Sequence, residues 1–155
     1  MPPVHQSGHQ ALRRHRCNIP GGIYLVTTTT HRRQRLFSDF SPARRMARQF
    51  ARQDLRAGVE LLAWVLMPDH VHWLVQLQGD TSLAQWTTRM KSGSARRFNR
   101  ATGHQGPVWA RAYHDHALRR NKDIKACARY LVANPLRAGL AENIGDYPFW
   151  DAVWL

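Results

Sequence analysis

Apolar positions recur along the chain with two different periods, which predict where its strands and helices lie. Alternating or β-branched runs predict strands over residues 23–30, 59–67 and 70–77, and a fourth strand within residues 108–118. Helical spacing predicts helices over about residues 42–57, 82–99 and 121–134. The predicted order of elements is therefore βαββαβα.

Capping and turn residues mark the ends of these elements. Ser41 followed by Pro42 predicts the N-terminus of the first helix, and Gly58 predicts its end. The Pro-Asp pair at 68–69 is typical of a tight turn, so the second and third strands would form a hairpin. Ser82 can cap the second helix with its side-chain oxygen.

This order of elements is that of a ferredoxin-like βαββαβ sandwich, which is an α+β fold. In it, an antiparallel sheet carries both crossover helices on one face. The last helix would be an addition at the C-terminus. The length fits a single compact domain over residues 21–155. Residues 1–20 are basic and lack an apolar period, so we expect them to form a flexible arm.

The charge of the chain is strongly unbalanced, with 23 Lys and Arg against 10 Asp and Glu and a formal net charge of +13. A polyanionic partner is the first expectation, although a basic surface without a particular target would have the same composition. The two cysteines, Cys17 and Cys127, have neither the spacing of a metal knuckle nor that of a disulfide framework. Because no apolar run is long enough to cross a bilayer, we expect a cytoplasmic, nucleoid-associated protein without a membrane partner.

The third predicted strand contains two histidines, His70 and His72, two positions apart. Side chains alternate between the faces of a strand, so these two imidazoles share one face. The other face takes the apolar residues Val71, Trp73, Val75 and Leu77. Two imidazoles on one rigid strand can bind a divalent ion and leave positions open for a further ligand. Two partly exposed histidines without a ligand would give the same pattern.

The last predicted helix carries a second candidate, Tyr130. This helix would be capped by Asn121 and end near Pro135, with a core stripe of Ile124, Cys127, Ala128 and Leu131. Tyr130 lies at the flank of that stripe, and Asn134 follows one turn later in the same direction. A phenol is a weak nucleophile at neutral pH unless a cation or base assists it. The simpler alternative is a tyrosine that packs at the helix edge with its hydroxyl in water.

Further basic and aromatic residues are candidates for binding nucleic acid. Those we expect to contact the phosphates of a nucleic acid are Lys91, Arg97, Arg119 and Arg120. His114 and His116 share a strand face and would lie next to the site. Of the tryptophans, Trp73, Trp86 and Trp109 have the neighbours of core residues, whereas Trp150 and Trp154 could cover the sheet or stack on bases.

Six segments in this order resemble the successive motifs of the REP-associated tyrosine transposases. They lie at 21–27, 36–37, 67–72, 108–109, 114–119 and 130–140. The most specific are Met-Pro-Asp-His-Val-His at 67–72 and Tyr-Leu-Val-Ala-Asn-Pro-Leu-Arg-Ala-Gly-Leu at 130–140. A His-hydrophobe-His strand followed by this second motif is far rarer than either part alone. The resemblance covers residues from about 20 to 150.

The resemblance implies a role for four positions. His70 and His72 would bind a divalent ion of the Mg²⁺ or Mn²⁺ type, Asn134 would be its third ligand, and Tyr130 would be the nucleophile. The implied activity is metal-dependent cleavage and transfer of single-stranded DNA through a 5′-phosphotyrosine intermediate. The implied partner is a palindromic hairpin of repetitive extragenic (REP) type, and a monomer is favoured over a dimer.

Two other functions remain open from the sequence. A protein with the same fold could recognise palindromes and no longer cut them, because intact motifs do not prove activity. A ferredoxin-like RNA-binding domain would instead stack bases on exposed aromatic residues of the central strands. The third strand offers histidines rather than aromatic residues at its polar positions, which disfavours the RNA-binding function.

Overall fold

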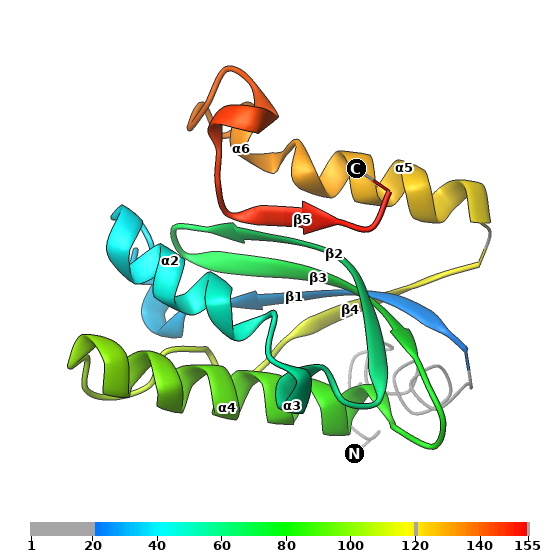
Figure 1. The fold of residues 1–155 in the computed structure, drawn as a ribbon, viewed down its shortest axis with the longest axis horizontal. Helices are drawn as coiled ribbons and strands as arrows, with labels where there is room; N and C mark the ends of the chain where they lie inside the picture. The colour runs from blue at the N-terminus through cyan, green and yellow to red at the C-terminus, as the bar shows by residue number, and fades with distance from the viewer. Residues whose placement is uncertain (1–20, 120, 155) are drawn as a thin grey trace, which may run out of the picture.

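The computed structural model describes residues 21–119 and 121–154, which form one antiparallel sheet with helices on both faces (Figure 1). Across the sheet, the strands are β4 (His114–Leu118), β1 (Ile23–Thr29), β3 (His70–Leu77), β2 (Val59–Met67) and β5 (Trp150–Ala152). All four neighbouring pairs are antiparallel. The predicted ferredoxin-like α+β fold is confirmed. The predicted arm over residues 1–20 lies outside the described residues.

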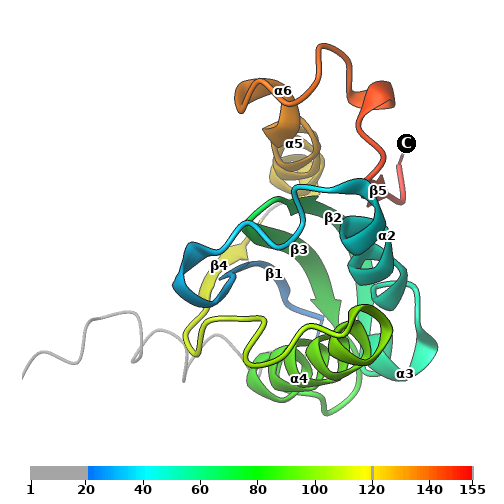
Figure 2. The ribbon, with the colours of Figure 1, turned by 90° about the vertical axis from the view of Figure 1, so that its left-hand side faces the viewer.

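The helices divide between the two faces of the sheet (Figure 2). One face carries α2 (Phe40–Gln49), α3 (Gln53–Arg56) and α4 (Leu83–Thr102). The other face carries α5 (Asn121–Val132), which continues into the single turn α6 (Asn134–Arg137). Two 3-10 turns, η1 (His31–Arg33) and η2 (Ile144–Asp146), complete the described elements. Both crossover helices therefore share one face, as predicted, and the C-terminal helix covers the other.

The two faces have separate hydrophobic cores. Beneath α2 and α4, the core is rich in aromatic rings, with Trp73 in edge contact with Phe50, Trp86 and Trp109 at centroid distances of 5.5, 5.6 and 5.9 Å. Beneath α5, a smaller cluster contains Leu74 of β3 and Leu131 of α5. The three tryptophans expected in the core are buried there, which also leaves no aromatic stacking platform on the described central strands.

The first predicted helix is wrong in one respect, because residues 42–57 form two helices rather than one. The structure has α2 ending at Gln49 and α3 beginning at Gln53, with an extended Arg52 between them. Phe50 and Leu55 are both buried, yet positions five apart on one helix point about 140° away from each other. The break lets both side chains enter the same core.

The other boundaries differ less from the prediction. The N-cap of α2 is Asp39 rather than Ser41, which leaves Pro42 in the first turn, where a missing N–H costs little. Ser82 caps α4 through a reciprocal pair of hydrogen bonds with Gln85, as the sequence indicated. The helical path does not end before Pro135, because that residue lies in the first turn of α6.

The C-terminal stretch forms an edge strand that the sequence did not predict. β5 is only three residues long and pairs with β2 from Ala63 to Val65. Its flanks are fixed by backbone bonds from Leu66 N to Phe149 O and from Val153 N to Leu62 O, each 2.9 Å. Trp150 therefore belongs to the sheet, and its indole nitrogen donates to the carbonyl of Ile144.

Candidate functional site

The two histidines of β3 lie at the centre of the sheet, on the face covered by α5. His72 is paired with Thr27 of β1 and with Val65 of β2. His70, two residues earlier on β3, is paired with the same two strands. Val65 belongs to the core beneath α5, so this is the α5 face. The expected sharing of one face by His70 and His72 is confirmed, with Trp73 on the opposite face.

Each histidine uses one ring nitrogen in a hydrogen bond to a neighbouring side chain. His72 Nδ1 is 2.7 Å from the hydroxyl of Thr27, and His70 Nδ1 is 2.8 Å from a carboxylate oxygen of Asp69. With Nδ1 as the donor in both cases, each Nε2 keeps a free lone pair. Metal-binding histidines are commonly oriented in this way by an outer carboxylate or hydroxyl.

The separation of the two rings fits a shared ion. Their centroids are 5.0 Å apart and their planes meet at 81°. An ion about 2.1 Å from a ring nitrogen lies about 3.2 Å from the centroid, so two rings bound at about 90–110° have centroids about 4.5–5.2 Å apart. No cluster of three or more His, Cys, Asp or Glu side chains suited to a metal occurs among the described residues. A further ligand would therefore be an amide, water or a phosphate oxygen.

Burial and nearby charges favour neutral imidazole in His72, and nearby charges favour ionised carboxylate in Asp69. Burial, with the charges of His70 and Arg137, lowers the pKa of His72 to about 4. Partial burial alone would raise the pKa of Asp69, but the hydrogen bond from His70 and the charge of Arg33 hold it below its ordinary value. Because a metal ligand must be deprotonated, His72 is in its binding form at neutral pH.

The turn η1, which follows β1, has a strained backbone and holds Asp69 in place. Arg32 and Arg33 both have φ of +55°, a left-handed conformation that few residues other than glycine adopt. This conformation brings Arg33 Nε to 3.2 Å from the Asp69 carboxylate. The backbone N–H of Thr30 also donates to the carbonyl of Asp69 at 2.9 Å. Strain of this kind is frequent where a protein fixes a functional side chain.

Tyr130 lies in the last turn of α5, with 68% of its side chain exposed. Ile124, Ala128 and Leu131 are buried against the sheet, so the predicted position of Tyr130 at the flank of that stripe is confirmed. The guanidinium of Arg137 lies over its ring, 3.7 Å from the centroid. Arg137 is also close enough to His72 to lower the pKa of that imidazole. One arginine thus connects the candidate nucleophile with the candidate metal ligands.

Asn134 is the first residue of α6 and is half-buried. Its backbone carbonyl accepts a hydrogen bond from Ala138, so the turn itself fixes the residue. It stands between Tyr130 and Arg137 in the chain, and α6 also packs on β2, the strand beside the histidines. Its side-chain amide remains a predicted ligand.

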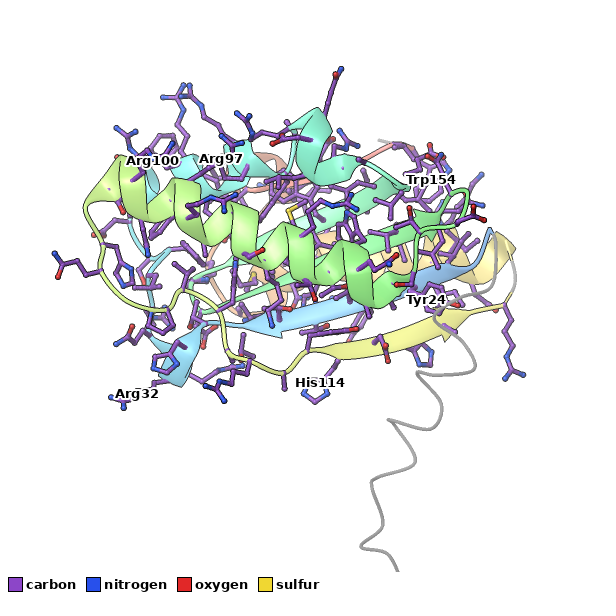
Figure 3. The ribbon with its side chains drawn as sticks, turned by 90° about the horizontal axis from the view of Figure 1, so that it is seen from below. Tyr24, Arg32, Arg97, Arg100, His114 and Trp154 are labelled. Atoms are coloured by element: carbon purple, nitrogen blue, oxygen red, sulfur yellow. The ribbon has the colours of Figure 1, made fainter. Side chains whose placement is uncertain are left out.

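The residues expected to bind the DNA backbone do not gather on one face. Lys91 and Arg97 belong to α4, on the face opposite the histidines; Figure 3 shows Arg97 and Arg100 along that helix. The ammonium of Lys91 donates to the carbonyls of Ala110 and Arg111, and Arg97 pairs with Asp54 at 2.8 Å. Arg119 is exposed just after β4, and Arg120 lies outside the described residues.

The second histidine pair lies on the edge strand β4, where Figure 3 shows His114. His114 is paired with Thr27, which in turn is paired with His72, so the three side chains share one face of the sheet. His114 and His116 are both exposed, whereas His70 and His72 are half-buried. A whole strand separates the two pairs, which places His114 and His116 beside the first pair rather than within it.

Sequence reasoning missed the residues that support the site. Thr27 and Arg33 come from segments distant in sequence, and only the register of β1 against β3 brings them to the histidines. Asp69 was seen only as a turn residue. The signal that could have revealed it is its place directly before His70, because a carboxylate there can reach the imidazole. Arg137 was noticed in its motif but given no role.

The family described as "Transposase IS200 like" matches residues 21–134, a stretch that contains both histidines, Tyr130 and Asn134. The chain belongs to this family. As an IS200-like transposase, it uses the ferredoxin-like sheet described above, and the matched stretch runs from the start of β1 to the start of α6.

Named relatives of this IS200-like transposase agree with the resemblance drawn from the motifs. The chain is 28% identical over 134 residues to the REP-associated tyrosine transposase of Escherichia coli, covering 84% of this chain and 76% of that protein. It is also similar to a solved structure described as a REP-associated tyrosine transposase bound to a REP hairpin, with 25% identity and a TM-score of 0.65. That similarity covers 86% of this chain and 78% of the other.

None of the helices in the described part of this transposase is both long enough and apolar enough to span a membrane.

Proposed function

We propose that this transposase cuts and rejoins single-stranded DNA, with Tyr130 as the nucleophile and His70 and His72 as metal ligands. The observation that carries this proposal is the contact of Arg137 with the ring of Tyr130, together with its electrostatic effect on His72. Arg137 thus contacts a residue of α5 and acts electrostatically on a residue of β3. An exposed phenol within reach of two oriented imidazoles would supply the nucleophile and the metal ligands for phosphoryl transfer to tyrosine.

The reaction exchanges one phosphodiester bond for another, so the energy of the bond is conserved. The Oη atom of Tyr130 attacks the scissile phosphorus, an Oη–P bond forms, and the bond from phosphorus to the 3′-oxygen breaks. The phenolic proton passes to water, and the departing 3′-oxygen takes up a proton to become a hydroxyl. The product is a 5′-phosphotyrosine, which another 3′-hydroxyl can attack to rejoin DNA without ATP.

The side chains present fit a divalent ion. The free Nε2 atoms of His70 and His72 would bind it, with Asn134 as the predicted third ligand. An ion of the Mg²⁺ or Mn²⁺ type would polarise the phosphate and neutralise charge on its oxygens. Thr27 and Asp69 keep the imidazoles in the binding tautomer, and the exposed position of Tyr130 lets a DNA strand approach.

We propose a single-stranded DNA hairpin as the substrate class. A similar solved structure is described as bound to a REP hairpin, and the net charge of +13 suits a polyanion. The arginines of the chain would hold the DNA backbone, so binding should weaken steeply as salt rises.

The test is a denaturing gel of labelled hairpin DNA with single-stranded flanks, incubated with wild type, Tyr130→Phe or Tyr113→Phe. Wild type should form a protein–DNA adduct with Mg²⁺ or Mn²⁺ and lose it in a chelator. Tyr130→Phe should form none but still bind the hairpin, whereas Tyr113→Phe, changed on the α4 side of the molecule, should behave as wild type. Cleavage by Tyr130→Phe would remove Tyr130 from the mechanism. Binding of the hairpin by wild type without any adduct would instead identify a non-cleaving palindrome-binding protein.

A further inference from the structure

The guanidinium of Arg137 lies over the ring of Tyr130. Its central carbon lies 3.7 Å from the centre of the ring, which is ordinary van der Waals separation. An approach through the edge would bring one or two nitrogens to about 2.4–3.2 Å from the ring centre, which is short for contacting atoms. The distance therefore favours contact through the face, which leaves the N–H bonds at the edge of the guanidinium directed away from the ring.

Those N–H bonds have no acceptor in the described part of the protein. Several other arginines do have one: Arg33 reaches Asp69, Arg56 reaches the carbonyl of Leu61, and Arg89 reaches that of Ala57. In contrast, the contacts of Arg137 within the described ranges are its stacking on Tyr130 and its charge effect on His72. A fork of five donors held next to a nucleophile without a protein acceptor is suited to bind an anion.

The backbone fixes this position. Pro135 is buried in the first turn of α6, and the backbone N–H groups of Ala138 and Leu140 donate to the carbonyls of Asn134 and Pro135. The bond from Arg137 N to Ala133 O, 3.2 Å, keeps the chain helical just after α5, and Arg137 follows Tyr130 by seven residues, or about two turns. Figure 1 shows α6 at this end of α5, above the end of the sheet where β2 turns into β3.

We propose that Arg137 binds the two non-bridging oxygens of the scissile phosphate while it holds the ring of Tyr130, and is therefore a catalytic residue. This inference rests on the proposed function. A planar fork matches two phosphate oxygens at once, and its charge opposes the negative charge that grows on them as Oη attacks. Stacking also restricts the rotation of an otherwise exposed phenol, so the nucleophile and the phosphate are aligned by one side chain.

The first experiment compares adduct formation by Arg137→Gln, Arg137→Lys and the control Arg129→Gln. Arg129 is exposed on the same helix as Tyr130, so the control removes an equal charge from the same region. Arg137→Gln should slow the adduct by about 100-fold or more, as the loss of a donor to a developing oxyanion does. Arg137→Lys should recover part of that loss, because it restores the charge but not the fork. Arg129→Gln should stay within about threefold of wild type.

The second experiment separates phosphate binding from a purely structural role. In the Tyr130→Phe background, binding is measured for hairpin DNA with a normal phosphate or a methylphosphonate at the position that wild type cuts. A methylphosphonate lacks one charged oxygen. Arg137→Gln should weaken binding of normal DNA by about tenfold and leave binding of the methylphosphonate DNA nearly unchanged, a coupling that a double-mutant cycle measures.

Two results would overturn the inference: adduct formation by Arg137→Gln at the wild-type rate, or an equal loss of affinity for both DNAs. Failure of the proposed function looks different, because wild type itself would then form no adduct and no cut position could be assigned. Unfolding curves of all variants should coincide, since Arg137 is exposed.

Discussion

The two faces of the sheet differ in what they contain. The face beneath α2 and α4 is covered by interlocking aromatic rings, among them Phe50, Trp73 and Trp86. The face beneath α5 has a smaller aliphatic cluster, and beside that cluster the polar row of Thr27 and the two histidines remains half-exposed. The same strands therefore build a dense core on one side and a half-exposed polar surface with the candidate site on the other.

This difference predicts that the stability of the fold and the proposed chemistry depend on opposite faces of the same strands. Alternation along β3 puts Trp73 and His72 on adjacent positions but opposite faces. A change on the α4 side should therefore affect stability more than metal binding. A change on the α5 side should affect metal binding more than stability. The following predictions test this separation, from the largest expected effect to the smallest.

The largest effect should come from Phe50→Ala. Phe50 is fully buried and contacts both Trp64 and Trp73, so its removal leaves a cavity and should cost about 3–5 kcal/mol of unfolding free energy. Urea unfolding measures this loss. Phe40→Ala, at the first residue of the helix whose C-cap is Phe50, is the matched control, because Phe40 is 59% exposed and its loss should cost no more than about 1 kcal/mol. Equal costs at the two positions would contradict the described core.

Acid should weaken the α5 face through His72. The folded protein keeps this imidazole neutral, with a pKa of about 4, whereas in the unfolded chain the pKa is near 6.5. Between these values the unfolded state binds more protons, so the contribution is complete above about pH 6.5 and is lost as the pH falls toward 4. In a chelator, wild type should lose about 2 kcal/mol more than His72→Gln between pH 7 and pH 4. Parallel pH profiles for the two proteins would contradict the low pKa.

Thr27→Val should weaken metal binding with little effect on folding. The substitution keeps the shape of the side chain but removes the oxygen that receives His72 Nδ1–H. Loss of such an outer partner typically lowers metal affinity by about 10-fold or more. Titration with Mn²⁺ measures it, with Thr29→Val as the control on the same strand and face. Unchanged affinity in Thr27→Val would show that this hydroxyl does not orient a ligand.

The smallest effect should come from Ser82→Ala, on the α4 side. It removes the hydrogen bond from the backbone of Gln85 and breaks the capping box, which should cost about 1 kcal/mol of unfolding free energy. Adduct formation by the folded protein should be unchanged, because α4 lies across the sheet from the histidines. A cleavage defect larger than the folding defect would contradict the separation of the two faces.

Much of the fold follows from local patterns in the sequence. The faces of β3, the capping by Ser82 and the stripe of α5 depend on neighbours within a few residues, so periodicity and capping rules predict them. The break between α2 and α3 could not be predicted in this way. It depends on where Phe50 and Leu55 meet the sheet, which is tertiary information. β5 escaped prediction because three residues are too few to show a period.

The same limit applies to the site. His70, His72 and Tyr130 were predicted from strand alternation and from a resemblance to known motifs. Thr27 was not, because its contact with His72 depends on the register of two strands 45 positions apart in the chain. Arg137 was not, because its contact with Tyr130 depends on how α6 follows α5. Side chains that carry chemistry can be recognised by type, whereas those that support them are recognised only by position.

The left-handed pair Arg32 and Arg33 has a consequence for the order of folding. A short peptide of this sequence would rarely adopt such a conformation, since each residue costs about 1 kcal/mol or more. The bonds that offset this cost are long-range: Thr30 N to Asp69 O, and His31 N to Val108 O. The turn should therefore close late, after β1, β3 and the segment near residue 108 have met. The contact between Arg33 and Asp69 would then be among the last to form, so the candidate site would be complete only in a nearly complete domain.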